Sequence, residues 1–568
     1  MQHFLTYLSA CLSAWFSSTL TATRSLLLVA PALLAGTAAG QTTLVVNVNG
    51  YTLDTDQNLQ QFAALQFTDD RVDRVYRTGE RLPGGADLTV VDGEGNTLLP
   101  GLIDAHGHVL NFGLSLLRVD LTGTTTEQEA ARRVQAFQAA NPDLTWVQGR
   151  GWNQVLWEGG DFPSSASLDT LLPDTPVWLS RVDGHAGWAN SAALKIAGIG
   201  VSTPDPEGGQ IIRDNEGRPT GVLVDNAMGL VTRNIPALTQ DELKFALHRA
   251  MTELARFGLT SVHDAGLSAS TVEAYKSLLE EGPLPVRIYA MLAATDPANA
   301  ANLAAGYYES ADQTLSIRSV KISADGALGS RGAALLEDYS DMEGHRGLLL
   351  LEPARLTELM RAAMQAGFQV NTHAIGDRAN KVVLDNYAAL IAATGTRDLR
   401  HRVEHAQVLT YDDILRFSEL GVIPSMQATH ATSDKNMAED RLGSVRIQGA
   451  YAWRKLMEAG ALIANGSDFP VESPNPFFGL HAAITRQDHS NEPPGGWYPE
   501  ERMTREEALT SFTLHAAYAG HQENLLGSLE AGKKADFILI DRDIMTVPSN
   551  EIWSTEVLQT WMNGQRVN

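Results

Sequence analysis

Short apolar runs alternate with longer amphipathic segments between residues 98 and 464, and this alternation constrains the fold more than any other feature of the sequence. Apolar runs bounded by turn residues are typical of buried parallel strands, whereas apolar residues that recur every three or four positions are typical of helices. We interpret eight runs as strands: Leu98–Ala105, Thr260–Asp264, Val286–Met291, Arg318–Ile322, Gln369–His373, His401–His405, Val422–Gln427 and Ala461–Ala464. The amphipathic segments between the later runs include Leu356–Ala366, Arg378–Ala393, Tyr411–Leu420 and Tyr451–Glu458. Eight strands with helices between them fit an α/β protein built on a (β/α)8 barrel better than one built on an open sheet.

Both ends of the chain are rich in short strand-like runs and turns. Thr43–Val48 and Arg71–Tyr76 have this texture near the N-terminus, as do Asp536–Ile540 and Val557–Trp561 near the C-terminus. We therefore expect one small β domain composed of residues 41–97 and 523–568, on either side of a barrel domain at residues 98–522.

The stretch from Val109 to Gly258 separates the first two expected strands and is far too long for a barrel loop. We expect an inserted subdomain at about residues 120–257. Five of the ten tryptophans of the chain lie within it: Trp146, Trp152, Trp157, Trp178 and Trp188.

The first forty residues have the pattern of a secretory signal peptide. Arg24 is their only Lys, Arg, Asp or Glu, and it precedes the apolar run Leu26–Leu34 and then small residues up to Gly40. An uncleaved membrane anchor is the alternative, since Phe4–Leu20 is also uncharged and fairly apolar. Cleavage near Gly40 removes Cys11, the single cysteine, which suits an oxidising compartment. We expect an exported protein, periplasmic or secreted, with no membrane contact after cleavage.

Charge and cysteine content exclude several classes of partner and site. The chain has 43 Lys and Arg against 67 Asp and Glu, a formal charge of −24, and this argues against a nucleic-acid partner because phosphate binding needs a basic face. A single cysteine excludes a thiolate zinc cluster, so any metal must be held by histidines or carboxylates. We expect a small-molecule substrate, and we keep a homodimer as an open alternative to a monomer.

Metal-binding residue types occur where the expected barrel strands end. His106 and His108 close the first strand two positions apart, and at the period of a strand both rings point to one face. His373 ends the fifth strand, His405 ends the sixth, and Asp468 follows the eighth. Because the carboxyl ends of barrel strands form the face that carries active sites, we expect these side chains to meet at one metal site.

Lys321 ends the fourth expected strand, where a charged amine inside a barrel is costly to bury. One interpretation is an ion pair with Asp325 or Asp468. The other is that burial depresses the pKa of the amine, and that the neutral amine adds carbon dioxide to become a carbamate that bridges two cations. The residues alone leave both interpretations open.

A known family shares the motifs in which these residues lie. The motifs are Pro100-Gly-Leu-Ile-Asp-Ala-His-Gly-His, Asp183-Gly-His-Ala-Gly-Trp-Ala-Asn-Ser, Lys321 to Gly332, Asn371-Thr-His-Ala-Ile-Gly-Asp-Arg, Val403-Glu-His-Ala, Asn465-Gly-Ser-Asp and Ala531-Gly-Lys-Lys-Ala-Asp-Phe. Together they resemble the amidohydrolase superfamily of metal-dependent hydrolases, in the branch typified by N-substituted formamide deformylase. The resemblance covers nearly all of the chain after the signal peptide. It implies a (β/α)8 barrel with a β-sandwich formed by both termini.

The resemblance also implies a ligand set and a reaction. In this set one divalent metal is held by His106, His108 and Asp468, a second by His373 and His405, and a carboxylated Lys321 bridges the two. The family varies between one and two ions; Zn²⁺ is our expectation, although Mn²⁺, Fe²⁺ and Co²⁺ suit the same donors. The implied reaction is attack of a metal-bound hydroxide on a carbonyl carbon, with Asp468 first accepting and then delivering a proton.

Other residues are candidates for contacts with the substrate. We assign a catalytic role to His185 in the insert, and substrate contacts to Trp152, Trp188, Asp325, Arg331 and His430. The alternatives are that the insert residues fill the core of the subdomain, and that the aspartate and the arginine form a local ion pair.

The leading functional expectation is an exported hydrolase that cleaves an amide-like C–N bond of a small molecule. We expect a neutral or weakly polar substrate with an apolar or aromatic substituent, because tryptophans are concentrated in the insert and no basic cluster accompanies them. Ester, lactone or carbamate hydrolysis by the same site is an alternative, and deamination is another that leaves Lys321 unexplained. An inactive barrel serving as a binding module is the alternative of a different class, although this chain keeps all six ligands.

Overall fold

A parallel barrel forms the centre of the computed structural model, which describes residues 40–142 and 144–568. Its strands follow one another in chain order and all pair in parallel. They are β8 (Leu102–Gly107), β15 (Leu259–Leu267), β16 (Arg287–Ala293), β18 (Leu315–Ser323), β19 (Gln369–Ala374), β20 (Arg402–His405), β21 (Ile423–Gln427) and β22 (Ala464–Gly466). The expectation of a (β/α)8 barrel is confirmed.

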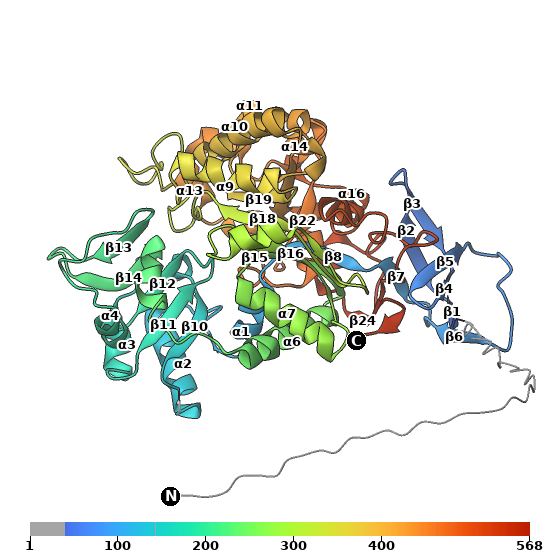
Figure 1. Cartoon of the computed structure of the whole chain (residues 1–568), viewed down its shortest axis with the longest axis horizontal. Helices are drawn as coiled ribbons and strands as arrows, with labels where there is room; N and C mark the ends of the chain where they lie inside the picture. Colours follow the sequence, from blue (N-terminus) through green and yellow to red (C-terminus); the bar gives the residue numbers. More distant parts are fainter. Residues whose placement is uncertain (1–39, 143) are drawn as a thin grey trace, which may run out of the picture. The chain divides into compact units, whose positions relative to one another are not determined.

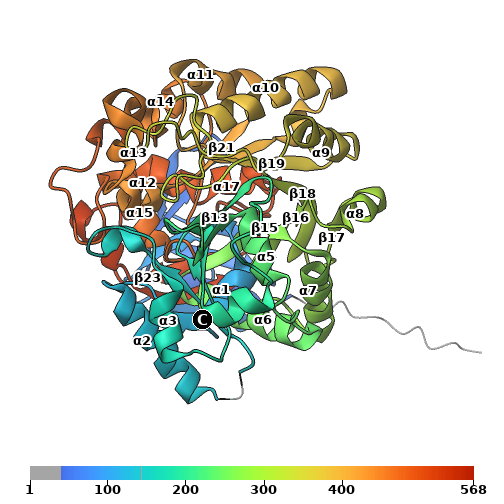
Figure 2. The same cartoon turned by 90° about the vertical axis from the view of Figure 1, so that its left-hand side faces the viewer.

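Helices lie around the outside of these strands (Figure 2) and bury an apolar side against them. The helices between and after the strands are α6 (Gln240–Arg256), α7 (Ala269–Glu281), α8 (Asn299–Ala305), α9 (Pro353–Gln365), α10 (Asp377–Thr394), α11 (Tyr411–Leu420), α12 (Ala428–Asp434), α13 (Ala438–Arg446), α14 (Trp453–Glu458), α15 (Pro476–Thr485), α16 (Arg505–Ser511) and α17 (Leu514–Ala519). Helix α6 begins with a capping box in which the side chains of Thr239 and Glu242 each accept a hydrogen bond from the other's backbone N–H. Helix α11 has the bounds that the sequence predicts for the amphipathic segment at residues 411–420.

Backbone hydrogen bonds close the barrel at the edge where β22 meets β8. The amide of Asp468 donates to the carbonyl oxygen of His106 at 2.7 Å, and the amide of His108 donates to the carbonyl oxygen of Phe469 at 2.8 Å. These bonds lie at the carboxyl ends of the two strands. Closure of the barrel therefore also brings Asp468 beside the two histidines.

Two expected barrel strands differ from the structure. The run at residues 98–105 is divided at Gly101 into β7 (Thr97–Pro100), which pairs with terminal strands, and β8 of the barrel. A side chain at position 101 would meet Thr260, because an added Cβ lies 2.2 Å from its Oγ1 atom, so only glycine fits this crossing. The eighth strand spans Ala464–Gly466 rather than residues 461–464.

Strands from both ends of the chain form two further sheets. One has the order β5-β4-β1-β6 and the other the order β25-β24-β23-β7-β2-β3. Phe67, Leu98 and Phe537 are among the buried residues packed between them. The strands are β1 (Thr42–Val46), β2 (Asn49–Leu53), β3 (Leu59–Phe62), β4 (Ala64–Thr68), β5 (Arg71–Tyr76), β6 (Leu88–Asp92), β23 (Phe537–Ile540), β24 (Val557–Met562) and β25 (Gln565–Arg566).

A separate sheet lies within the segment between β8 and β15. Its order is β13-β14-β12-β11-β10-β9, and Figure 1 shows it in teal on the side of the barrel away from the terminal sheets. Its strands are β9 (Val119–Asp120), β10 (Val147–Trp152), β11 (Val177–Arg181), β12 (Ala186–Ala189), β13 (Gly209–Arg213) and β14 (Pro219–Asp225). The helices of this part of the chain are α1 (Val109–Ser115), α2 (Glu127–Ala140), α3 (Ser165–Leu171), α4 (Ser191–Ile196) and α5 (Gly229–Thr232).

Among the described residues, no helix combines the length and the apolar character that crossing a bilayer requires. The signal peptide expected at residues 1–40 lies outside the described residues, apart from Gly40.

Candidate active site

The six expected metal ligands all lie at the carboxyl ends of barrel strands. Nitrogen and oxygen atoms of His106, His405 and Asp468 lie within 4.8 Å of one another, and all three side chains are buried. The Nε2 atom of His108 lies 3.1 Å from Oδ1 of Asp468. His373 adjoins the group, because its ring centre lies 4.5 Å from that of His405. The structure therefore brings these five side chains together.

Hydrogen bonds to Nδ1 orient three of the histidine rings. The Nδ1 atom of His106 lies 2.5 Å from Oε2 of Glu404, that of His108 lies 2.9 Å from the carbonyl oxygen of Ala265, and that of His405 lies 2.7 Å from Oε1 of Gln427. Each partner is an acceptor, so in the neutral form of each ring Nδ1 carries the proton and Nε2 presents a lone pair. Such partners are typical of the outer contacts that fix metal-binding histidines.

The nitrogen and oxygen atoms that these side chains turn toward one another fit a bound cation. The Nε2 atoms of His106 and His108 lie 3.6 Å and 3.1 Å from Oδ1 of Asp468, a buried oxygen with no hydrogen-bond partner among the described residues. Burial also lowers the pKa of His106 to about 4 and that of His373 well below its usual range. Neutral imidazoles and a carboxylate that face each other in a dry site are the donor set of a divalent transition metal.

Backbone strain accompanies two of these ligands. His405 has φ of 76° and Asp468 has φ of 61°, in the left-handed region that residues with a Cβ seldom adopt. Asp104 holds the second of these segments in place: its carboxylate accepts hydrogen bonds from the amide of His106 at 3.0 Å and from the hydroxyl of Ser467 at 2.6 Å. Strain at two ligands, one of them beside a segment that a buried carboxylate holds, is typical of a pre-organised functional site.

Lys321 is buried in this group without a carboxylate partner. Its Nζ lies 3.2 Å from Nε2 of His106, and it forms no ion pair within 4.0 Å among the described residues. The alternative of an ion pair with Asp325 is wrong, because that carboxylate accepts backbone hydrogen bonds from Ala334, Ile375 and Gly376 instead. Burial lowers the pKa of the amine, which raises its neutral fraction.

His430 differs from the metal-ligand histidines in its protonation. The side-chain amide of Gln407 donates to its Nδ1 at 2.9 Å, so the proton of a neutral His430 is on Nε2. That Nε2 is buried, has no hydrogen-bond partner among the described residues and lies 3.7 Å from Oδ2 of Asp468. His430 therefore presents a donor to the site.

His185 reaches the site from the insert. Its Nδ1 donates to Oδ1 of Asp225 at 2.7 Å, and its ring centre lies 5.4 Å from that of His373. Burial disfavours its charged form, but the hydrogen bond and the charge of Asp225 outweigh burial and raise the pKa of His185 to about 9. The raised pKa favours the imidazolium at neutral pH, and its Nε2–H has no acceptor among the described residues.

A cavity of about 940 Å³ opens over this group between the barrel and the insert. His108, His185 and Asp468 are among the residues that line it. Leu116 and Leu156 are 40% and 54% exposed and add apolar surface to its wall. The cavity has the size and mixed lining of a small-molecule site.

Trp152 and Trp188 do not line this cavity, so their expected role in substrate binding is wrong. Both are 0% exposed and pack in the core of the insert, where their indoles donate to the carbonyl oxygens of Leu179 and Ser164. On β10 the pairing register shifts between Arg150 and Trp152. Because of this bulge, Trp152 points away from the face of β10 on which Arg150 borders the cavity.

The expected substrate contacts of Asp325 and Arg331 are also wrong, as is the ion pair between them. Asp325 is 0% exposed and accepts only backbone hydrogen bonds. Arg331 pairs with Asp341 at 3.0 Å and lies outside the cavity lining. Both residues stabilise the long loop after β18. Of the expected substrate-binding residues, only His430 lines the cavity.

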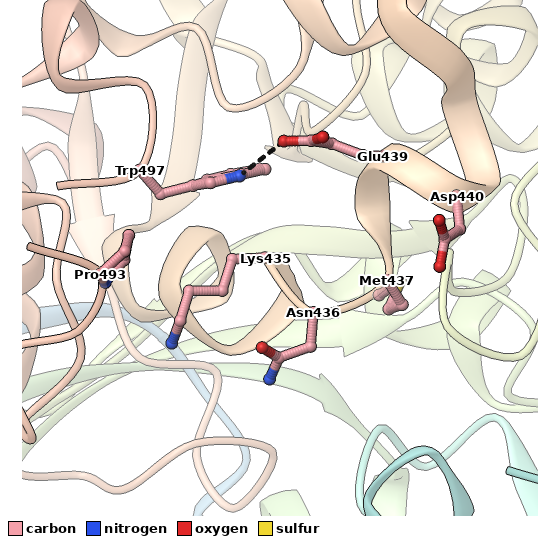
Figure 3. Close-up of a pocket in the computed structure, with 7 residues that line it drawn as sticks. All are labelled: Lys435, Asn436, Met437, Glu439, Asp440, Pro493 and Trp497. Atoms are coloured by element: carbon pink, nitrogen blue, oxygen red, sulfur yellow. Dashed lines mark hydrogen bonds between the residues drawn. The ribbon is translucent and has the colours of Figure 1, made fainter. Parts of the chain in front are cut away.

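A smaller hollow of about 340 Å³ adjoins the cavity and shares Lys435, Asn436 and Met437 with its lining (Figure 3). The indole of Trp497 donates to Oε1 of Glu439 at its edge, 3.2 Å away. None of the metal-ligand residues lines this hollow.

Two buried charges of the site were not identified from the sequence. Arg402 pairs with Glu404 at 2.8 Å, and its guanidinium also contacts Nδ1 of His263 at 3.0 Å. Arg402 and Glu404 are two positions apart on β20, a strand whose residues are all buried. This spacing in the sequence predicts that the two side chains point to the same face inside the barrel.

Comparison with known proteins agrees with this geometry. A model of the amidohydrolase family matches residues 89–568. Protein LONG AFTER FAR-RED 3 of Arabidopsis thaliana is 36% identical over 489 residues, covering 84% of this chain and 82% of that protein. N-substituted formamide deformylase of Arthrobacter pascens is 27% identical over 540 residues, covering 92% and 97%. An uncharacterized metal-dependent hydrolase from Pyrococcus horikoshii has a similar crystal structure, with a TM-score of 0.71, 25% identity, and coverage of 89% of this chain and 99% of that one. The chain therefore belongs to the amidohydrolase family and is a metal-dependent hydrolase.

Proposed function

We propose that this hydrolase cleaves the C–N bond of an amide-like small molecule and that it acts outside the cytoplasm. The observation that carries the proposal is the convergence of Nε2 of His106, Nε2 of His108 and the carboxylate of Asp468 beneath a cavity of about 940 Å³. The similarity to an N-substituted formamide deformylase over 97% of its length supports an amide over other substrates.

The residues around the proposed metal have complementary roles. A bound divalent metal acidifies water and polarises a carbonyl group. Asp468 is the general base that accepts a proton, and it then delivers this proton to the leaving nitrogen. The imidazolium of His185 and the Nε2–H of His430 supply hydrogen-bond donors for the carbonyl oxygen as negative charge develops on it.

We further propose that Lys321 is carboxylated and that the ions are Zn²⁺. The neutral amine adds carbon dioxide and releases a proton, and the resulting carbamate replaces the amine with two oxygen ligands. Support comes from the burial of Lys321, its lowered pKa and its contact with Nε2 of His106. Together with His373 and His405 this gives the six-ligand set, which suits two ions.

The test of the reaction is hydrolysis by the purified enzyme, stripped with a chelator and reloaded with one metal at a time. N-formyl and N-acetyl amines are compared with esters of the same acyl groups. We expect the amides to be cleaved only after reloading, with Zn²⁺ effective. Cleavage of esters alone, or no cleavage with Zn²⁺, Mn²⁺, Fe²⁺ or Co²⁺, contradicts the proposal.

The carbamate is tested with Lys321→Ala. We expect this variant to lose most of its metal and activity, and a short carboxylic acid added to the buffer to restore part of both. Wild-type enzyme prepared with ¹³C-bicarbonate should give a carbamate signal in its carbon NMR spectrum. Full metal content and normal turnover in the variant exclude the bridging role.

Export is tested separately by expressing the complete chain with a C-terminal tag. We expect the tagged protein outside the cytoplasm, with an N-terminus near residue 41 when it is sequenced. A cytoplasmic protein that keeps residues 1–40 contradicts this part of the proposal.

A further inference from the structure

Two arginines, Arg150 on strand β10 and Arg118 directly before strand β9, line the cavity. Strands β9 and β10 pair in parallel with Arg150 opposite Asp120, and Arg118 lies two positions before Asp120. Residues opposite each other, and residues two apart on one strand, point to the same side of a sheet. Arg150 and Asp120 line the cavity as the register requires, and Arg118 lines it from the bend before β9.

Apart from Lys321 in the group of metal ligands, these arginines differ from the other cations of the cavity wall in having no carboxylate partner. Arg181 pairs with Asp183, and Lys435 pairs with Asp488 at 2.7 Å. Neither Arg118 nor Arg150 lies within 4.0 Å of a carboxylate in the part of the chain that the structure describes.

Most of their hydrogen-bonding capacity also remains unused. Arg150 donates to the carbonyl oxygen of Val182, and Arg118 donates to no described residue. A guanidinium has five N–H donors, and two such groups in one wall leave several available to a ligand. Burial lowers the pKa of both arginines, that of Arg150 to about 10, so the protein holds two poorly solvated positive charges against the cavity. An unpaired cation in such a place is costly unless an anion arrives to compensate it.

The register places the two positions near each other. Arg150 lies opposite Asp120, which follows Arg118 by two residues. After burial, the charges of Asp468, Asp183 and Asp120 affect the pKa of Arg150.

We propose that Arg118 and Arg150 bind a carboxylate of the substrate, so that the preferred substrates are amides with an acidic group near the scissile bond, such as N-acylated amino acids. Guanidinium groups recognise carboxylates through paired, charge-assisted hydrogen bonds. This inference rests on the proposed amide hydrolysis and replaces the expectation of a neutral substrate. The apolar wall at Leu116 and Leu156 remains available for a side chain of the same molecule.

The test compares two amides that differ only in the carboxylate: N-acetylphenylalanine, as a racemate, and N-acetyl-2-phenylethylamine. Each is assayed with the metal-loaded wild type and with Arg118→Gln and Arg150→Gln. We expect each variant to lose roughly 10-fold or more in kcat/KM for the acid, mainly through KM, and less than about 3-fold for the neutral amide. Lysine at either position should restore part of the loss, because it keeps the charge. Arg132→Gln removes an exposed arginine of the same subdomain and should change neither value.

Equal losses for both amides, or no loss for either, overturn the proposal.

A binding measurement distinguishes failure of the carboxylate site from failure of the proposed hydrolysis. Calorimetric titration of N-acetylphenylalanine into metal-loaded Asp468→Asn, with and without each arginine substitution, needs no turnover. Affinity that falls roughly 10-fold with each substitution supports the carboxylate site even if neither amide is cleaved. Affinity that stays the same shows that the acid binds elsewhere, for instance on the metal, and contradicts it.

Discussion

The Nδ1 atom of His106 lies 2.5 Å from Oε2 of Glu404, and both side chains are fully buried. Glu404 is also paired with Arg402, and these two partners outweigh the effect of burial and hold the pKa of its carboxyl below its usual range. Glu404 is therefore an anion that keeps the proton of His106 on Nδ1. Its charge makes the Nε2 atom that faces the site a stronger metal donor.

Glu404→Gln should weaken metal binding without unfolding the barrel. A neutral amide removes the negative charge behind His106, and we expect metal affinity to fall roughly 10- to 100-fold, with activity recovered at high metal concentration. Competition with a chelator measures the affinity. Glu419→Gln, which changes an exposed glutamate of α11, is the control. Equal affinities in the two variants would show that Glu404 only balances the charge of Arg402.

Asp468→Asn separates proton transfer from metal binding. Asparagine keeps an oxygen ligand but accepts no proton, so turnover should fall roughly 10²-fold or more while much of the metal remains. Parallel measurement of kcat and of metal per chain decides the matter. Turnover within a few-fold of the wild type would show that Asp468 binds the metal but does not transfer the proton.

The cavity lining predicts opposite outcomes for two apolar residues of the insert. Trp152→Ala leaves a hole in a packed core and should cost about 3–5 kcal/mol of stability, without discriminating between aromatic and methyl amides. Leu156→Ala removes a side chain that is 54% exposed on the cavity wall. It should raise KM for aromatic amides several-fold and leave the melting temperature nearly unchanged. The reverse pattern contradicts the assignment of the cavity wall.

His401 makes the protein sensitive to acid at a position away from the metal ligands. Burial lowers its pKa to about 3, and its Nδ1 accepts a hydrogen bond from the amide of Val370. The unfolded chain takes up a proton near pH 6.5, whereas the folded chain does not, so the stability that depends on neutral His401 is complete above pH 6.5 and is lost as the pH falls.

At about pH 5 this single group costs about 2 kcal/mol relative to neutral pH. Glutamine has no such titration. When the pH is lowered from about 7.5 to about 5, the melting temperature of His401→Gln should therefore fall less than that of the wild type. Parallel losses in the two proteins exclude His401 as a source of acid sensitivity.

The parts of the site that could be predicted from the sequence are those set by local periodicity. A ligand at the end of an apolar run lies at the carboxyl end of a strand, and His106, His373 and His405 follow this rule. The same rule fails where the backbone departs from regular geometry. The bulge between Arg150 and Trp152 exchanges the faces of β10, so the tryptophan enters the core while the arginine meets the cavity.

Partners distant in the sequence could not be predicted from periodicity. Asp225 holds His185 from 40 residues away, and Glu404 holds His106 from 298 residues away. Such pairs depend on the register between strands and on where the insert folds back over the barrel. Both follow from packing of the whole chain, and no single segment encodes them.

Anomalous diffraction from crystals of the zinc-loaded enzyme, measured at the zinc absorption edge, tests the central claim most directly. The account predicts a strong peak roughly 2.0–2.3 Å from Nε2 of His106 and from the carboxylate of Asp468, and a second peak beside His373 and His405 if Lys321 is carboxylated. A catalytically active crystal without a peak at these ligands, or with zinc only at other residues, would contradict it.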